Sequence, residues 1–126
     1  MVARWRLQPG NPAMTEAPRV KTELWVQAQV WLCNAHAIPI VVVRRGDADA
    51  GAVLLRLVRP AGKCLLLRRV TVIEGVADWM VVAGGGEVDQ AAAEALVARE
   101  VGRDRDLWVV EVDDPKGRYW PDRAPG

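Results

Sequence analysis

The first apolar segment after the proline-rich start of the chain has the period of a helix. Thr22 is a suitable N-cap and Pro39 cannot continue a helix, so the pattern predicts a helix from Thr22 to about Ala37. At 100° per residue, its apolar side chains fall on two faces. The first face carries Leu24, Ala28, Trp31, Leu32 and Ala35, and the second carries Val26, Val30, Cys33 and Ala37. Either one thick core or a second subunit would cover such a helix. In the latter case, Val26, Val30 and Cys33 are interface residues.

Farther along the chain, short apolar runs separated by turn signals predict strands. These runs cover residues 40–43, 52–58, 63 to about 73, 78–82 and 107–112. A second helix is predicted between the N-cap Asp89 and Gly102, which is suited to end it. Short loops favour antiparallel pairing of consecutive strands, because parallel pairs need longer connections. The sequence therefore predicts a single α+β domain, an antiparallel meander of about four to five strands with two helices.

Helix and strand breakers without a periodic pattern mark the beginning of the chain. We therefore expect residues 1–21 to form a flexible N-terminal tail, residues 22–120 a single domain and residues 121–126 a C-terminal tail. Met14 is an alternative start to Met1, because every segment with a folded pattern follows it. The glycines Gly84–Gly86 lack the spacing of a phosphate-binding loop and are interpreted as a hinge or linker.

The composition is that of a soluble globular protein, with 51% apolar and 26% charged residues. A formal net charge of +1 gives little attraction to nucleic acid or to an anionic membrane. Two cysteines are too few for a disulfide scaffold. The pattern contains no signal peptide and no apolar run long enough to span a membrane. We therefore expect a cytoplasmic protein that does not bind membranes.

A charged segment, residues 44–53, lies between two of the predicted strands. Asp47 and Asp49 face the same side of an extended chain, and with Arg44 and Arg45 they could surround a small ligand or a metal-bound phosphate. The same aspartates and the neighbouring glycines are also typical of turns, in which carboxylates accept hydrogen bonds from nearby amides. The segment is thus either a turn, which is the simpler interpretation, or a ligand site.

Cys33 and His36 are neighbours on the predicted helix and could share a metal ion, with Cys64 or a carboxylate completing the site. The closely spaced ligand pairs of most zinc sites are absent, so packing of Cys33 in the core is the simpler interpretation. The lone histidine lies in an apolar helix and is a poor general base. We therefore predict no catalytic residue and no cofactor.

Four arginines could form a basic stripe across the sheet and bind nucleic acid together with exposed tryptophans. They are Arg56, Arg59, Arg68 and Arg69. Glu111 and Asp113 are available to balance their charge, so nucleic acid is not the expected partner.

Three segments resemble a known family. They are residues 20–26 at the start of the first helix, the charged segment 44–53 and residues 106–112 with Trp108. Together they are similar to short bacterial proteins known as domain of unknown function 1491, over about residues 19–118. The resemblance implies a small cytoplasmic domain with no assigned activity, and it transfers no catalytic residue.

These observations favour a non-enzymatic protein-interaction module that forms a homodimer, through the second face of the first helix or through a sheet edge. Its further partner would be another protein. Two alternatives stay open. The first is an enzyme acting on a small molecule, or depending on a metal, at the charged segment. The second is a nucleic-acid binder that uses the arginine-bearing face of the sheet.

Overall fold

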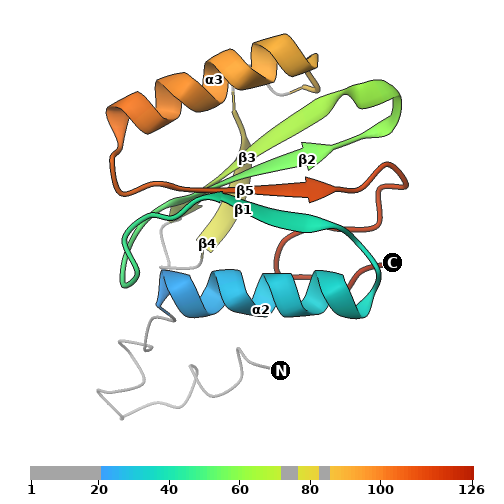
Figure 1. Cartoon of the computed structure of the whole chain (residues 1–126), viewed down its shortest axis with the longest axis horizontal. Helices are drawn as coiled ribbons and strands as arrows, with labels where there is room; N and C mark the ends of the chain where they lie inside the picture. Colours follow the sequence, from blue (N-terminus) through green and yellow to red (C-terminus); the bar gives the residue numbers. More distant parts are fainter. Residues whose placement is uncertain (1–20, 72–76, 83–85) are drawn as a thin grey trace.

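A five-stranded sheet lies between two helices, with α2 on one face and α3 on the other (Figure 1). The computed structural model describes residues 21–71, 77–82 and 86–126. The helices are α2 (Thr22–Ala35) and α3 (Gln90–Arg103), and the strands are β1 (Ile40–Arg44), β2 (Val53–Val58), β3 (Cys64–Thr71), β4 (Ala77–Val81) and β5 (Trp108–Asp113). The predictions for residues 1–20, including Met14 as a start, and for most of the glycine run 84–86 lie outside the described residues.

The predicted fold class is confirmed, because two helices and a mostly antiparallel sheet form one α+β domain. Strands β2, β3 and β4 form the expected meander. The strand order β1-β5-β2-β3-β4 differs from a simple meander at one point, since β5 lies between β1 and β2. It pairs antiparallel with β1 and parallel with β2.

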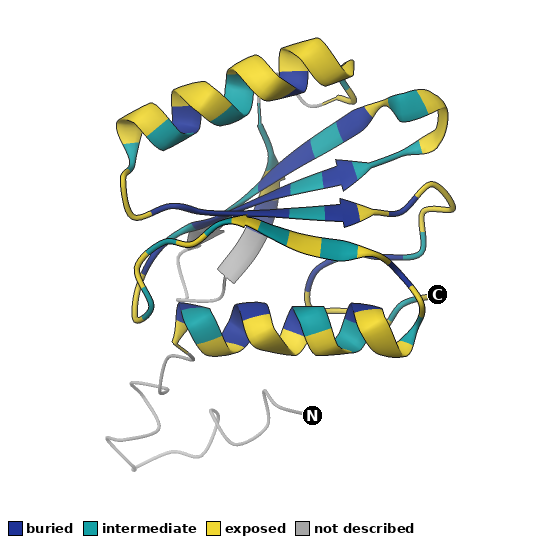
Figure 2. Cartoon of the chain, in the orientation of Figure 1, coloured by how far each residue is buried: buried dark blue, intermediate teal, exposed yellow. Residues whose placement is uncertain are grey.

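The central position of β5 follows from its side chains. Trp108, Val109 and Val110 are consecutive buried residues, so β5 is apolar on both faces, as is typical of an interior strand that is covered on each face. In β1, half-buried and exposed residues alternate instead, as in an edge strand with one covered face (Figure 2). Loop length therefore gave the correct direction of the two hairpin pairs, β2–β3 and β3–β4, but not the two pairs that β5 forms with β1 and β2.

Two apolar clusters form the core, one on each face of the sheet. The cluster under α2 includes Trp25, Val26, Cys33 and the α2-facing side chains of the strands. The cluster under α3 includes Ala93, Leu96 and Val97 together with apolar side chains from β2, β3 and β5. Among the described residues, no side chain of β1 belongs to the α3 cluster. The face of β1 on the α3 side is therefore left open.

The helix ends differ in how well local signals predicted them. Asp89 caps α3 as expected, and its carboxylate accepts a hydrogen bond from the Ala92 N–H at 2.8 Å. Thr22 was expected to cap α2, but it is the first helical residue, and its hydroxyl donates instead to the Gly51 carbonyl at 2.8 Å. This bond fixes the start of α2 against the end of the charged segment. The helix ends at Ala35, before Ala37 with its positive φ of 57°.

The C-terminal residues, expected to form a tail, contact the α2 face of the domain. The Asp122 carboxylate accepts hydrogen bonds from the indole N–H of Trp25 at 2.8 Å and of Trp79 at 3.0 Å. The two rings also contact each other, with centroids 5.4 Å apart. These bonds attach the end of the chain to α2 and β4. No helix in the described parts of the chain is long and apolar enough to cross a membrane.

Candidate functional site

The charged segment between β1 and β2 folds as a turn. The Asp47 carboxylate accepts a hydrogen bond from the Ala50 N–H at 2.8 Å, and the Asp47 carbonyl accepts one from the Gly51 N–H at 3.2 Å. Asp49 is exposed and lies 3.7 Å from the ammonium group of Lys21. The two aspartates therefore have different surroundings, and Asp47 has the role expected in a turn.

This turn packs tightly against the loop that leads into β5. A Cβ atom on Gly46 would lie 2.1 Å from the Asp106 carbonyl oxygen, so the close approach requires glycine. The Asp47 N–H donates to the same oxygen at 3.0 Å, and the Trp108 indole N–H donates to the Asp47 carbonyl at 2.8 Å. Arg44 strengthens this contact, since its Nη1 donates to the carbonyls of Arg105 and Leu107. Arg44 therefore serves the fold of the loop.

Arg45 points to the other side of the turn, toward α2. Its guanidinium lies 5.0 Å from the centroid of the Trp108 ring, and its Nη2 donates to the Glu23 carboxylate at 2.6 Å. The side chain remains 65% exposed, so other groups can still reach the cation. Arg45 also borders a cavity, which the other three side chains predicted to bind a ligand do not line.

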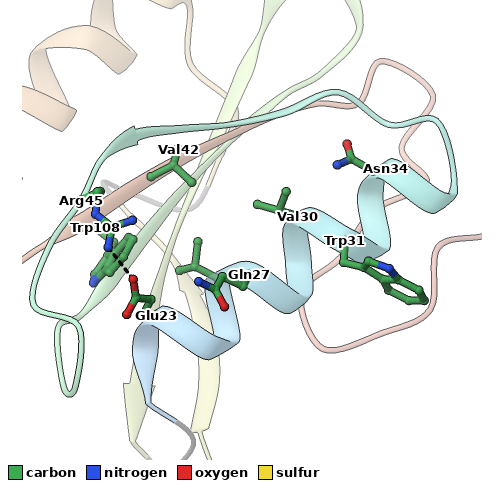
Figure 3. A pocket seen from close by; sticks show the side chains of 9 residues that line it. Glu23, Gln27, Val30, Trp31, Asn34, Val42, Arg45 and Trp108 are labelled. Atoms are coloured by element: carbon green, nitrogen blue, oxygen red, sulfur yellow. Dashed lines mark hydrogen bonds and ion pairs between the residues drawn. The ribbon is translucent and has the colours of Figure 1, made fainter.

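That cavity is a groove of about 280 Å³ between α2 and β1. Its lining residues come from α2, β1, β5 and the turn, and they are Glu23, Val26, Gln27, Val30, Trp31, Asn34, Val42, Arg45 and Trp108. Figure 3 shows Glu23 and Arg45 at one end and Trp31 and Asn34 at the other. The groove is therefore apolar in its middle, bounded by an ion pair at one end and by an exposed tryptophan at the other.

Trp31 is the most exposed large apolar side chain in the described residues, at 72%. Val41 and Val43 on β1 are also more than half exposed and point away from the core under α2. Among the described residues β1 has only β5 as a neighbouring strand, so no described strand pairs with its other edge. Apolar side chains thus border this edge on both faces of the sheet.

The three residues predicted to form an interface occupy different places. Val26 and Cys33 are buried in the core under α2, so they contact the sheet of their own chain. Val30 is half-buried and lines the groove. The apolar face that α2 leaves exposed is instead the other predicted one, with Leu24 and Trp31. Which face is covered depends on the position of the helix over the sheet, and periodicity alone could not determine it.

Cys33 and His36, the predicted metal pair, lie in the last turn of α2 and at its C-cap. Cys33 is fully buried, and desolvation, with a smaller contribution from the negative charge of Asp114, raises the pKa of its thiol from 9.0 to about 11. Cys64 belongs to the cluster on the opposite face of the sheet. Within the described residues, no three histidine, cysteine or acidic side chains are grouped so as to hold a metal ion. Cys33 packs in the apolar cluster under α2.

The arginines of the proposed basic stripe each have a partner within the domain. Arg56 pairs with Glu94 and Arg68 with Glu100, both across to α3. Arg59 pairs with the buried Asp114, and Arg69 lies over the Trp25 ring on the opposite face of the sheet. Because they are divided between the two faces and paired with carboxylates or a ring, these arginines form no continuous cationic surface.

Sequence reasoning missed several groove residues that a helical spacing could have indicated. Glu23, Gln27 and Trp31 follow one another at intervals of four, which places them on one line along α2. A search for apolar periodicity does not find this spacing, because the three residues differ in polarity. Trp108 lines the groove because of where β5 lies in the sheet, and no local sequence pattern indicated this position.

Three comparisons place the chain among known proteins. A family model described as a protein of unknown function, DUF1491, matches residues 20–120. No curated protein matches the chain. A crystal structure of a DUF1491 family protein from Caulobacter crescentus CB15 is 32% identical, with a TM-score of 0.72, and the match covers 79% of this chain and 92% of that one. An NMR structure of a DUF1491 family protein from the same organism is 30% identical with a TM-score of 0.73, over 82% and 94% of the two chains.

A solution structure of a protein from A. tumefaciens is 26% identical with a TM-score of 0.64, and the match covers 76% of this chain and 86% of that one. The resemblance noted in the sequence is thus confirmed by the family model and by structures of proteins from this family. The chain belongs to the DUF1491 family, whose function is unknown.

Proposed function

We propose that the protein is a non-enzymatic protein-interaction module that self-associates through the edge of β1 and the adjoining side of α2. The observation that supports this most is the position of the exposed apolar side chains Trp31, Val41 and Val43 beside an unpaired strand edge. Scattered exposed apolar residues are normal on a monomer, but a group of them at a strand edge is typical of an interaction surface.

The charged segment supports binding rather than catalysis. Arg44 and Asp47 are engaged in contacts that hold the turn against the loop before β5. The charged groups that border the groove, Glu23 and Arg45, neutralise each other. An enzyme that used this segment would need reactive groups held together and directed into a cavity. Here the cavity is lined mainly by apolar and amide side chains.

A second copy is the partner that fits this surface. Two β1 strands that pair antiparallel across a two-fold axis place Arg44 of one copy near Ile40 of the other, which keeps the arginines apart. A bulge between Val42 and Arg44 limits the regular part of β1 to its first residues. Backbone pairing is therefore short, and side chains such as Val41 supply much of the contact.

The proposal is tested by analytical ultracentrifugation of the wild-type protein and two variants. Val41→Glu places a charge beside the β1 edge, and we expect it to be monomeric where the wild type is a dimer. Met80→Glu is the matched control, because Met80 has nearly the same exposure, 57% against 58%, but lies on β4 at the opposite edge of the sheet. We expect this control to dimerise as the wild type does.

Two results would overturn the proposal. The first is a wild-type protein that stays monomeric up to about 1 mM, since any dimer would then be worth less than about 4 kcal/mol. The second is an equal loss of dimer in Met80→Glu, which would place the interface elsewhere. Circular dichroism of each variant confirms that the fold is retained.

A further inference from the structure

We infer that Trp31 of each copy occupies the groove of the other copy, next to Arg45 and Glu23. This inference rests on the proposed self-association and specifies its main contact. The groove opens beside β1, where the two copies meet, and Trp31 lies at the end of α2 away from the ion pair (Figure 3). One chain therefore carries both the tryptophan and the Arg45–Glu23 end of the groove that would receive it, but at separate places along α2.

Two-fold symmetry brings these halves together. Trp31 and Glu23 are eight residues apart on α2, or about 12 Å along the helix axis. When two β1 edges pair antiparallel, the axis is perpendicular to the sheet, and the two α2 helices lie side by side on the same face in opposite directions. The Trp31 end of one helix then faces the Glu23 end of the other. Each chain gives one tryptophan and receives one, as an isologous interface requires.

The chemistry of the groove suits an indole ring. Val30 and Val42 supply an apolar floor for the ring. The Arg45 guanidinium, already stacked on Trp108, offers its exposed side to the π face of a second ring. The Glu23 carboxylate, which is 35% exposed, provides an acceptor for the indole N–H. An aromatic side chain with one N–H donor satisfies these three features together.

The size of the contact is consistent with a specific dimer. A tryptophan side chain buries about 150–250 Å². Two such rings and the two grooves that receive them reach roughly half of the 1,200–2,000 Å² that stable interfaces bury. The paired β1 edges with Val41 and Val43 provide further contact area. Trp31 would thus be the central anchor, the place where tryptophan is most often found in interfaces.

The test measures the dimer dissociation constant of the full chain by analytical ultracentrifugation. We expect Trp31→Ala to raise the constant by at least about tenfold, because it removes both anchors. Leu24→Ala is the matched control, since Leu24 is also an exposed apolar residue on α2, at 56%, but does not line the groove. We expect it to leave the constant within about twofold of the wild type.

A mixed dimer tests whether the ring reaches the partner's groove. Trp31→Ala retains the Arg45 and Glu23 end of the groove, and Arg45→Ala retains the tryptophan. In the heterodimer one complete contact between Trp31 and Arg45 forms, whereas neither homodimer has any. We therefore expect the dissociation constant of the heterodimer, corrected for the statistical factor of a mixed dimer, to be about fivefold lower than the geometric mean of the two homodimer constants. This factor corresponds to the coupling energy of one cation–π contact.

The outcomes separate this inference from the proposed function. If the wild type dimerises but Trp31→Ala dimerises equally well, self-association stands and the role of Trp31 is refuted. If the heterodimer shows no gain over the geometric mean, Trp31 does not contact Arg45 of the other copy and the inference is overturned. If the wild type is monomeric, both fail. A weakened Trp31→Ala dimer together with a coupled heterodimer supports both.

Discussion

Asp122 near the C-terminus offers a sharp test of how the described fold is held together. Its carboxylate accepts hydrogen bonds from the indole N–H groups of Trp25 and Trp79, which come from α2 and β4. It therefore links α2 to a strand of the sheet whose tryptophan side chain lies in the same apolar cluster as Trp25. Replacing Asp122 with alanine removes the acceptor for both bonds, and it also removes a residue type that tolerates its positive φ of 63°.

The magnitude follows from the number and the exposure of these bonds. A hydrogen bond to a charged group contributes about 1.5–3 kcal/mol when it is buried. Both bonds are only part-buried, so water can replace some of the lost interaction. We expect Asp122→Ala to lower the free energy of unfolding by about 1–3 kcal/mol. Asp122→Asn keeps one acceptor oxygen and the tolerance for positive φ, so its loss should be about half as large.

Urea denaturation followed by far-ultraviolet circular dichroism measures these losses. Asp113→Ala is the control for the removal of one negative charge, because Asp113 is exposed at the end of β5. We expect this control to stay within about 0.5 kcal/mol of the wild type. If Asp122→Ala also stays within that range, the C-terminal residues do not stabilise the domain and the reasoning is wrong.

Three further predictions concern the turn and the core. Gly46→Ala should lower the free energy of unfolding by at least about 2 kcal/mol in urea denaturation, because the new Cβ would collide with the Asp106 carbonyl. Gly102 lies in α3, and a Cβ atom there would have no neighbour within 4 Å, so Gly102→Ala should instead raise the free energy of unfolding by up to about 1 kcal/mol. Equal changes in the two glycine variants would contradict the role of the close contact at Gly46. Asp47→Ala should lower the free energy of unfolding by about 0.5–1 kcal/mol, because the hydrogen bond from Ala50 is lost, and Asp49→Ala should lower it by less than about 0.5 kcal/mol. A larger loss in Asp49→Ala than in Asp47→Ala would contradict the turn role of Asp47. Because the pKa of Cys33 is raised from 9.0 to about 11, its contribution to stability is complete below pH 9 and is lost as the pH rises through 11. Cys33→Ala should therefore flatten the decline of stability between these pH values, and an unchanged slope would show that folding does not raise the pKa of this thiol.

Local signals in the sequence predicted the elements well and their neighbours less well. Asp89 caps α3 as expected, because an N-cap needs only backbone groups three residues away. The position of β5 between β1 and β2 depends on pairs about 50 to 70 residues apart in the chain. Loop length carries no information about such pairs. The apolar character of β5 on both faces was the one signal that favoured a central strand.

The residues of the candidate site could also be predicted only in part, because local patterns do not report contacts between distant residues. The sequence singled out Arg45 because charges and glycines gather around it, and this side chain does border the groove. Its neighbours Glu23 and Trp108 lie 22 and 63 positions away, so only the folded chain brings them to Arg45. Likewise, the bonds from Trp25 and Trp79 to Asp122 span 97 and 43 residues. A periodic pattern cannot reveal contacts of this kind.

The two apolar faces of α2 have different physical explanations. Burial of Trp25, Val26 and Cys33 against the sheet accounts for one face, because these side chains fill the core of the chain itself. The same core does not account for Leu24 and Trp31, which are mostly exposed. Folding stability therefore requires only the face that carries Trp25, Val26 and Cys33. Trp31 is the one of these two side chains that lines the groove, and the proposed self-association with a second copy would account for its exposure.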